Sequence, residues 1–291
     1  MQETVYDAAV IGGGIAGYEA VLTLKNFKRS VLWLGVKKFG EKLENAEWVR
    51  NFPSFSGTGA EFAALLTAQA EREGIALTEA RIDGVYAMGE KFLLTAGKQT
   101  FAARTVVLAT GVETAGSTKG EREFFGRGVS YCAVCDGALY KGKTIAAVCT
   151  APQFEEEVEY LAGFAEKVYA FCTYQGAHFK AANIEGFTET PQALEGGMRV
   201  EKIVAKGGEY AVDGVFFLKR STPPAALVGG LETTEDGHAK ISRDGSTNIK
   251  GLFAAGDITG TPYQFAKAAG EGCVAAYSVH AYLNKLPHSQ K

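Results

Sequence analysis

The sequence lacks any hydrophobic run near the roughly 20 residues that a membrane-spanning helix needs. It also lacks a charge imbalance, because 33 acidic residues face 30 Lys and Arg, which excludes a strong field toward nucleic acid or an anionic membrane. The N-terminus MQETVYDAAV has no basic segment of the kind that opens a signal peptide, and the chain has no internal repeat or low-complexity tract. We therefore expect a cytoplasmic globular protein without a nucleic-acid or membrane partner.

Cysteine and histidine are too few and too dispersed to predict a metal centre. Of the five cysteines only Cys132 and Cys135, in SYCAVCDG, are closely spaced, and none of the four histidines is placed to complete a zinc site with them. A C-x-x-C pair of this kind is typical of a redox-active disulfide, in which one thiol often has a lowered pKa and acts as the nucleophile. The other three cysteines are scattered in apolar surroundings and are interpreted as inert core thiols: Cys149, Cys172 and Cys273.

The segment VYDAAVIGGGIAGYEAVLTLKNF predicts a buried strand, a glycine turn and an amphipathic helix. Its glycines fit the G-x-G-x-x-G pattern of a dinucleotide site. Gly12 allows the tight turn, Gly14 lets the backbone approach a pyrophosphate, and Gly17 lets helix and strand pack closely. Ile15 and Ala16 lie between these glycines, at the helix N-terminus that faces the phosphates. A nucleotide site at this turn is the prediction.

Two further strands are expected to complete this site, and one expected residue is missing. The pattern calls for Asp or Glu at the end of the second strand to hold a ribose, but Gly35 stands there. The strand in TVVLATG and the strand in GLFAAGDITG both end in small residues, and Asp257 is predicted either to accept from sugar hydroxyls or to cap the helix that follows. The candidate ligand-binding residues from these segments and from the start of that helix are Ala109, Thr110, Gly111, Gly256, Asp257, Gln264 and Phe265.

Taken together, these segments resemble the low-molecular-weight thioredoxin reductases over nearly the whole chain. The stretches that carry the resemblance are VIGGGIAGYEA, NFPSFSGTGAEF, VVLATG, SYCAVCDG and GLFAAGDITGTPYQFAKAAGEG. The resemblance implies an FAD flavoprotein that reduces a partner disulfide. It implies that Cys135 lies against the flavin, that Cys132 attacks the partner and that Asp136 is the acid/base of the exchange, whereas an Asp before Gly137 is also an ordinary turn residue. Asn51 aligns with a family segment near the flavin.

The length and the order of these parts predict an α/β protein of two Rossmann-like, three-layer ββα domains. We expect residues 1–111 and 237–291 to form the FAD-binding domain. Residues 112–236 are expected to form an inserted central domain with the redox pair and a degenerate NADPH-type site. The family also implies a homodimer.

The segment IAAVCTAPQFEEEVEYL predicts a second strand–turn–helix, but its turn contains no glycine. The three positions expected to be small are Cys149, Ala151 and Phe154, and Phe154 stands where the helix would meet phosphate. The family's H-R-R for a 2′-phosphate is replaced by the residues at 172–174, which include no cation. We interpret this as a nucleotide fold whose pocket has been filled. The open alternative is a divergent NADH site with another phosphate-binding geometry.

A reductase without NADPH needs another electron donor, and the chain is similar to the ferredoxin-dependent thioredoxin-reductase-like proteins that lack the NADPH motifs. A ferredoxin near roughly −400 mV and a thioredoxin near about −270 mV differ by ~130 mV, or ~6 kcal/mol for two electrons. We therefore expect ferredoxin as donor, FAD as carrier and thioredoxin as acceptor. Acidic ferredoxins favour a basic docking face, for which the candidate residues are Lys25, Lys28, Arg29, Lys37, Lys38 and Lys42.

Two other functions remain open at this point. One is a disulfide oxidoreductase that takes electrons from NADH or from a second flavin, for which Tyr131, Tyr174 or Tyr263 would offer a stacking face. The other is a redox sensor that reports the state of the flavin and the cysteine pair. An intact C-x-x-C followed by Asp favours turnover over sensing, although a sensor can keep the same pair.

Overall fold

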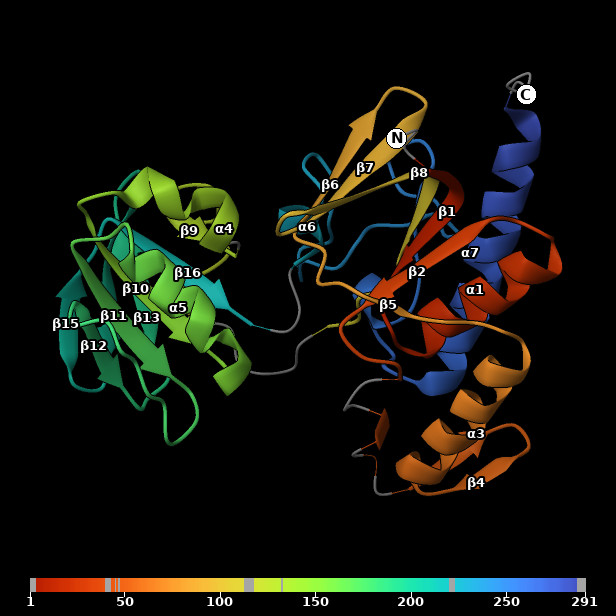
Figure 1. Ribbon diagram of the computed structural model, residues 1–291, viewed down its shortest axis with the longest axis horizontal. Coiled ribbons are helices and arrows are strands. Elements are labelled where there is room, and N and C mark those ends of the chain that lie inside the picture. The colour runs from red at the N-terminus through yellow and green to blue at the C-terminus, as the bar shows by residue number, and fades with distance from the viewer. Residues whose placement is uncertain are drawn as a thin grey trace. The chain divides into compact units, whose positions relative to one another are not determined.

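The computed structural model divides into two compact units, which we call the outer unit and the inserted unit (Figure 1). The outer unit comprises Met1–Val112 and Pro223–Lys291, and the inserted unit comprises Glu113–Thr222. The structure describes residues 4–39, 43–44, 46, 48–112, 118–131, 133–219 and 223–286, with the backbone alone at Cys135. Within these residues no helix is long and apolar enough to span a bilayer, including the 21-residue α7.

The outer unit is built on a seven-stranded sheet with the order β5-β2-β1-β8-β7-β6, in which β17 pairs with β8. The strands β5, β2, β1, β8 and β17 run parallel, while β6, β7 and β8 form an antiparallel meander at one side. A separate hairpin joins β3 (Val49–Phe52) to β4 (Phe55–Gly57). The sheet strands are β1 (Val5–Ile11), β2 (Val31–Gly35), β5 (Thr78–Glu79), β6 (Gly84–Met88), β7 (Lys91–Ala96), β8 (Gln99–Leu108) and β17 (Leu252–Ala254).

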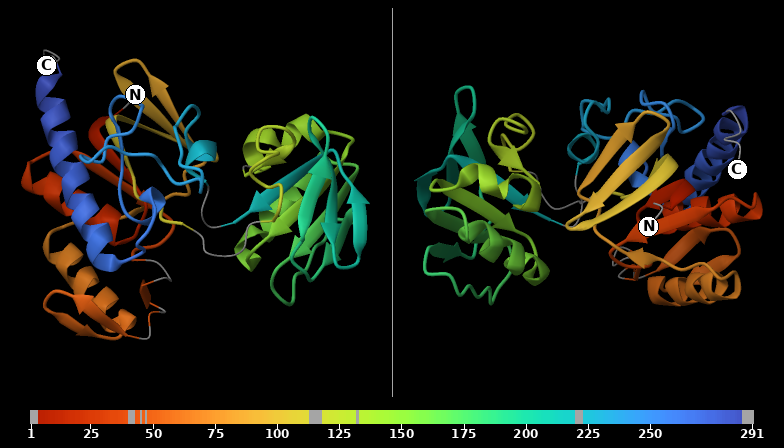
Figure 2. Two further views of the ribbon diagram at one scale, coloured as in Figure 1. Left: turned by 180° about the vertical axis from the view of Figure 1, so that it is seen from behind. Right: turned by 45° about the horizontal axis from the view of Figure 1, so that its top comes forward.

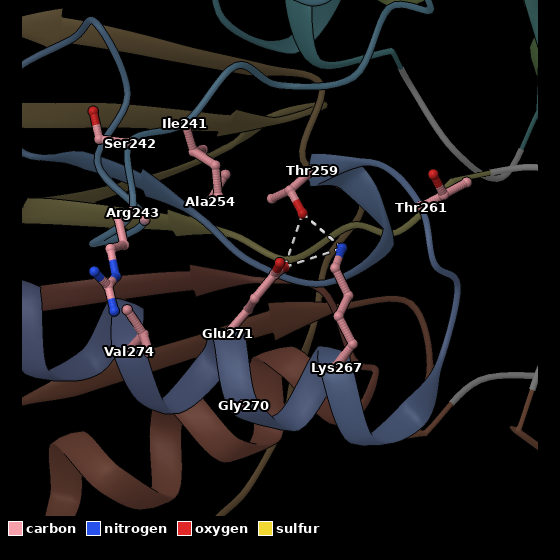
Figure 3. Close-up of a pocket in the computed structure, with 11 residues that line it drawn as sticks. Ile241, Ser242, Arg243, Ala254, Thr259, Thr261, Lys267, Gly270, Glu271 and Val274 are labelled. Carbon is pink, nitrogen blue, oxygen red and sulfur yellow. Dashed lines mark hydrogen bonds and ion pairs between the residues drawn. The ribbon is translucent and has the colours of Figure 1, made fainter.

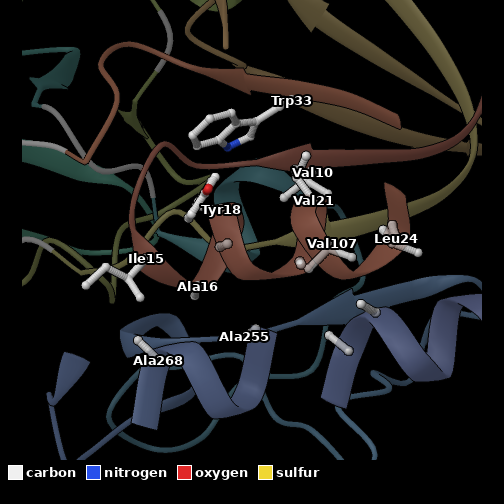
Figure 4. Packing of buried hydrophobic residues seen from close by; sticks show 14 of the residues in the cluster. Val10, Ile15, Ala16, Tyr18, Val21, Leu24, Trp33, Val107, Ala255 and Ala268 are labelled. Atoms are coloured by element: carbon white, nitrogen blue, oxygen red, sulfur yellow. The ribbon is translucent and has the colours of Figure 1, made fainter. Parts of the chain in front are cut away.

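Two helices, α1 (Ile15–Asn26) and α7 (Phe265–Lys285), lie side by side over one face of this sheet (Figures 1 and 2). They approach so closely that a Cβ on Gly272 of α7 would lie 2.3 Å from the carbonyl oxygen of Ala16. Figure 4 shows the apolar cluster beneath them, in which Ala16 faces Ala268 and Ala255. Other helical elements of this unit are α3 (Gly59–Arg72), α6 (Pro224–Leu227) and the short 3₁₀ turn η3 (Asp257–Thr259).

The inserted unit has three layers, as the sequence predicts. A five-stranded parallel sheet of order β12-β11-β10-β16-β9 carries α5 (Glu155–Ala162) against one face. An antiparallel sheet, β13-β14-β15, contacts its strands through Tyr210, whose ring packs on Tyr169 and Phe187. Besides α5, the described elements of the inserted unit are β9 (Val129–Ser130), α4 (Ala133–Asp136), η1 (Gly137–Tyr140), β10 (Thr144–Cys149), η2 (Pro152–Phe154), β11 (Lys167–Cys172), β12 (Ile184–Phe187), β13 (Ala193–Gly196), β14 (Val200–Ala205), β15 (Gly208–Ala211) and β16 (Gly214–Leu218). Two Rossmann-like units in an α/β fold are therefore present.

The second crossing between the units comes earlier than the sequence suggests. The expected boundary at 236/237 is corrected to 222/223, because the segment after Pro223 packs into the outer unit. Leu227 and Leu231 of this segment are buried in the same apolar cluster as Leu252 and Ile258. The polar run ETTEDGHAK, interpreted as the crossing, is a surface loop within the outer unit.

Candidate functional site

The glycine turn between β1 and α1 has the geometry that its motif predicts. Gly12 adopts φ +127°, and a Cβ there would lie 2.1 Å from the carbonyl oxygen of Ala109. A Cβ on Gly17 would lie 2.1 Å from the Gly12 carbonyl oxygen, so this glycine lets the helix pack on the turn. Gly14 differs, because no atom of the described structure lies within 4 Å of its Cβ position, although it is the N-cap of α1. The Gly14 backbone at the helix N-terminus is therefore open to the approach of a ligand.

The missing acid at the end of β2 has a steric reason. A Cβ on Gly35 would lie 2.9 Å from the backbone nitrogen of Gly13, so any side chain would collide with the glycine turn. The loop that follows folds over the same turn, because the Phe39 amide donates to the Gly13 carbonyl at 2.6 Å. A ribose contact of the usual acidic kind is thus absent from this position, as the sequence indicates.

The end of β8 forms the second wall of the site. The Ala109 amide donates to the Ile11 carbonyl at 2.7 Å, which fixes residues 109–111 beside the glycine turn. The Thr110 hydroxyl oxygen is buried and has no hydrogen-bond partner among the described residues. Gly111 adopts φ +68°, and nothing described lies within 4 Å of its Cβ position. A buried, unsatisfied hydroxyl costs about 1–3 kcal/mol, so its position beside open glycines fits a polar ligand.

Two predicted residues that are far apart in the sequence contact each other. The Asn51 side-chain amide in β3 donates to the side-chain oxygen of Gln264 at 2.6 Å, across a separation of 213 residues. Gln264 is the N-cap of α7, and Phe265 opens the helix and packs partly buried against the core of the outer unit. The hairpin of β3 and β4 and the start of α7 therefore meet at one place.

The turn after β17 is held by a charged cluster that the sequence interpretation missed. Gly256 adopts φ +87°, its amide donates to Glu271 Oε2 at 2.8 Å, and its carbonyl accepts from Lys267 Nζ at 2.9 Å. Lys267 and Glu271 also form an ion pair of 3.2 Å, one turn apart on α7. Figure 3 shows this pair with Thr259. The three residues line a cavity of about 520 Å³. The i,i+4 spacing of Lys267 and Glu271 in α7 is the signal that could have found this pair.

Asp257 begins the η3 turn and is followed by α7 only after several more residues. The N-cap of α7 is Gln264, so the interpretation of Asp257 as the cap of that helix is wrong. Its position directly after Gly256 at the end of a parallel strand leaves the sugar contact as a prediction.

The redox motif lies in the inserted unit, between β9 and η1. Cys132 lies outside the described residues, and Cys135 is placed only by its backbone, in the short helix α4. Asp136 ends this helix and accepts a hydrogen bond from Ser130 Oγ at 2.7 Å. Ser130 is buried, and sequence reasoning did not single it out. The contact orients the carboxylate of Asp136 with respect to the strand that leads into the motif.

Buried polar groups also hold the residue that precedes Cys132. The Tyr131 hydroxyl donates to Glu121 Oε1 at 2.7 Å, and Lys219 Nζ donates to the same oxygen at 2.5 Å. Burial, followed by the Glu121 charge, raises the pKa of Tyr131. Tyr131 is only 6% exposed, so it offers no open face for stacking a second flavin.

The turn after β10 is closed by side chains. Cys149, Ala151 and Phe154 are all buried, and Phe154 packs in the core of the inserted unit. The Tyr174 hydroxyl lies 3.5 Å from Cys149 Sγ and donates to Glu155 Oε1 at 2.8 Å. These side chains occupy the position that glycines leave open in a dinucleotide turn.

Two of the cysteines interpreted as scattered core thiols are in fact neighbours. Cys149 and Cys172 end β10 and β11 and are direct partners in the register of these parallel strands. Both side chains are buried in the apolar cluster of the inserted unit. The pairing depends on strand register, which a single sequence does not reveal.

Comparison with known proteins identifies the family. Residues 6–150 match the family model described as pyridine nucleotide-disulphide oxidoreductase. A curated thioredoxin reductase of Bacillus subtilis (strain 168) is 31% identical over 311 residues, covering 100% of this chain and 98% of the relative. The chain belongs to the thioredoxin reductase family. Two solved structures from Clostridium acetobutylicum, both named ferredoxin-flavin thioredoxin reductase, are also similar to it. One is 40% identical with a TM-score of 0.89, covering 98% of this chain and 100% of that chain, and the other is 34% identical with a TM-score of 0.81, covering 97% and 98%.

The protein is thus a flavin-dependent, thioredoxin-reductase-type disulfide oxidoreductase, and the cofactor of its family is FAD. The outer unit fits such a group. The turn at Gly12 and Gly14 suits a pyrophosphate, and the buried Thr110 hydroxyl supplies a polar contact that the protein itself leaves unmade. When bound, FAD would supply a group that can accept and donate electrons.

Proposed function

We propose that this thioredoxin reductase takes its electrons from reduced ferredoxin rather than from NADPH, and passes them through FAD and the Cys132–Cys135 disulfide to thioredoxin. The observation that carries the proposal is the closed turn after β10. In the thioredoxin reductase fold, the strand–turn–helix of the central domain is the expected NADPH site, and here its turn is filled by the protein's own side chains.

Opening the turn after β10 to a nucleotide would cost free energy. Phe154 is 3% exposed, and moving such a side chain into water costs about 1.5–3 kcal/mol. A nucleotide would also have to break the Tyr174–Glu155 hydrogen bond and would then meet the Glu155 carboxylate, which repels phosphate. The following strand offers no cation in return, because Cys172 and Thr173 stand where a 2′-phosphate would need one.

The similar structures from Clostridium acetobutylicum support the donor, because their names include both ferredoxin and flavin. The curated relatives from Bacillus subtilis and Listeria monocytogenes carry the name thioredoxin reductase, so they support the acceptor without specifying the donor. A potential drop of ~130 mV from ferredoxin to thioredoxin makes the transfer favourable.

Within this proposal the predicted residues take the following roles. Cys135 exchanges electrons with the flavin, Cys132 attacks the disulfide of thioredoxin, and Asp136 holds and moves the proton of the exchange. Ser130 is a positioning residue, because its hydroxyl fixes the Asp136 carboxylate. The residues assigned to FAD are Gly12, Gly14, Ile15, Ala16, Gly17, Asn51, Ala109, Thr110, Gly111, Gly256, Asp257, Gln264 and Phe265.

The basic docking face for ferredoxin is only partly available. Lys25 Nζ donates to the carbonyls of Glu73 and Gly74, and Lys37 pairs with Glu44 at 2.6 Å. Arg29 donates to His280 and Asn284, and Lys42 lies outside the described residues. Lys28 and Lys38 therefore remain the strongest docking candidates of this run, and a homodimer remains part of the proposal.

The test is anaerobic flavin absorbance with thioredoxin present as the final acceptor. Excess NADPH, then NADH, then reduced ferredoxin is added to the purified protein. We expect only ferredoxin to bleach the flavin and to reduce thioredoxin. Bleaching by either pyridine nucleotide at physiological concentration contradicts the closed site and indicates a divergent nucleotide-linked reductase. Bleaching by ferredoxin without reduction of thioredoxin indicates a redox sensor instead.

A further inference from the structure

Cys149 and Cys172 form a thiol pair that the reductase reaction does not use. Each is the last residue of its strand, and the two are register partners on the neighbouring parallel strands β10 and β11. They are 0% and 1% exposed. Their position is the closed turn of the inserted unit, where a nucleotide would otherwise bind.

The backbone places the two sulfurs within reach of a disulfide. Neighbouring strands lie about 4.7–4.9 Å apart, and register partners point to the same face of a sheet. Disulfides join residues whose Cα atoms are roughly 4.4–6.8 Å apart, so this spacing suits the bond. Both side chains are buried in the same apolar cluster of the inserted unit, so they lie on the same face of the sheet.

The surroundings make the two thiols unequal. Cys149 Sγ lies 3.5 Å from the Tyr174 hydroxyl and 3.4 Å from the Ala151 carbonyl oxygen. These polar contacts distinguish Cys149 from Cys172, which ends its strand in the same apolar cluster. Cys149 is therefore the candidate for the first attack on an oxidant, and Cys172 is the candidate for the resolving thiol.

We propose that Cys149 and Cys172 are a second redox-active dithiol, which a small peroxide oxidises to an intramolecular disulfide. The Cys149 thiolate attacks the peroxide, so that an S–O bond forms, the O–O bond breaks and one water leaves after protonation. The Cys172 sulfur then attacks the resulting sulfenic acid. An S–S bond forms, the S–O bond breaks, and the proton of Cys172 leaves with the second water. In total the two thiols supply two electrons and two protons, and hydrogen peroxide becomes two waters.

Burial defines the class of oxidant. Both sulfurs are covered, so a protein disulfide such as that of thioredoxin has no path to them, whereas hydrogen peroxide is close to water in size. The pair is thus separated in reactivity from the Cys132–Cys135 motif, which must meet a protein partner.

The pair is tested on the full-length wild-type protein, reduced first and then exposed to hydrogen peroxide. Remaining thiols are alkylated, and the protein is digested with trypsin without reduction. Cleavage after Lys143, Lys167 and Lys180 places Cys149 in peptide 144–167 and Cys172 in peptide 168–180. We expect these two peptides to be recovered joined by a disulfide, while Cys273 is still alkylated. Recovery of both peptides in alkylated form, at peroxide concentrations that oxidise Cys273, overturns the proposal.

Variants separate the pair from other thiols. Peroxide-treated Cys172→Ser should carry sulfenic or sulfinic acid at Cys149, because the resolving thiol is gone. Cys273→Ser should leave the linked peptides unchanged, since that cysteine lies on α7 in the outer unit. The Cys132→Ser, Cys135→Ser double variant should also still form the link. Loss of the link in that double variant, or a link found only between two copies of the chain, contradicts an independent intramolecular site.

Discussion

The turn between β1 and α1 and the turn between β10 and α5 both join a buried parallel strand to a helix, but they leave opposite surfaces. In the first, Gly14 caps α1 and its Cβ position is open. In the second, Phe154 caps α5 and is buried. Both turns keep the strand and helix that their domains need for a core. Under the proposed function, the difference means that a nucleotide-binding fold can persist without its nucleotide site, because the site depends on a few small residues in the turn.

The largest effect is expected from filling the open turn, with Gly12→Val. Gly12 has φ +127° and no room for a Cβ beside the Ala109 carbonyl, so we expect severe destabilisation, above about 3 kcal/mol, together with loss of flavin.

Gly14→Ala tests flavin binding with less effect on folding, because the added Cβ has no protein atom within 4 Å outside the adjoining residues. We expect this variant to fold with a stability within about 1 kcal/mol of wild type but to bind FAD more weakly by at least about tenfold.

Flavin content by absorbance and unfolding of the flavin-free protein by denaturant measure the two effects separately. If Gly14→Ala bound flavin as tightly as wild type, the pyrophosphate would have to lie elsewhere. The turn between β1 and α1 would then not be the open nucleotide site that the comparison assumes.

The converse change opens the closed turn, with Phe154→Gly. Here glycine removes a buried ring, and a loss of about 3–5 kcal/mol in the free energy of unfolding is expected. Tyr160→Ala is the control on the same helix, because Tyr160 is 39% exposed and should cost less than about 1.5 kcal/mol. We expect neither variant to gain NADPH-dependent bleaching, since the Glu155 carboxylate stays and no cation is added. NADPH turnover in Phe154→Gly would mean that a single ring separates the two electron donors.

These two turns also show what a single sequence can and cannot reveal. The roles of Gly12 and Gly17 followed from local spacing, and the filling at Phe154 followed from the same spacing with different residues. Asn51 and Gln264, both candidate cofactor residues, contact each other in the structure, which spacing alone does not reveal. The interpretation of Cys149 and Cys172 as core thiols agrees with their burial, but the sequence does not reveal that they are partners, because strand register is set by the whole sheet and not by either strand.

Other features were missed for the same reason, which is that they depend on tertiary contacts. The boundary at 222/223 is set by burial of Leu227 and Leu231 in the outer unit, while the polar run chosen as the crossing is only a loop. Ser130 reveals its role only when β9 and α4 are folded against each other. Gly35 departs from the motif because the glycine turn lies against it, a contact between separate segments.

The smallest effect is expected at the N-terminus of α3, which is capped by the protein's own side chains and not by a ligand. Thr58 accepts from the Glu61 amide, and Glu61 accepts from the Thr58 amide at 2.7 Å, forming a capping box at α3. Thr58→Ala should cost about 1 kcal/mol equally with and without FAD, whereas Gly14→Ala should cost clearly more with FAD than without it. The backbone hydrogen bond from Thr58 lowers the pKa of Glu61. The stabilisation that the ionised Glu61 side chain gives to the folded state is therefore present above the ordinary pKa of Glu, and it is lost as pH falls through the lowered pKa. Denaturant unfolding from neutral to acidic pH should therefore show the difference between wild type and Glu61→Gln shrinking toward low pH. A stability difference between wild type and Glu61→Gln that grows on acidification would contradict the assigned cap. A loss of stability in Thr58→Ala that changes with FAD would show that the start of α3 also responds to the cofactor.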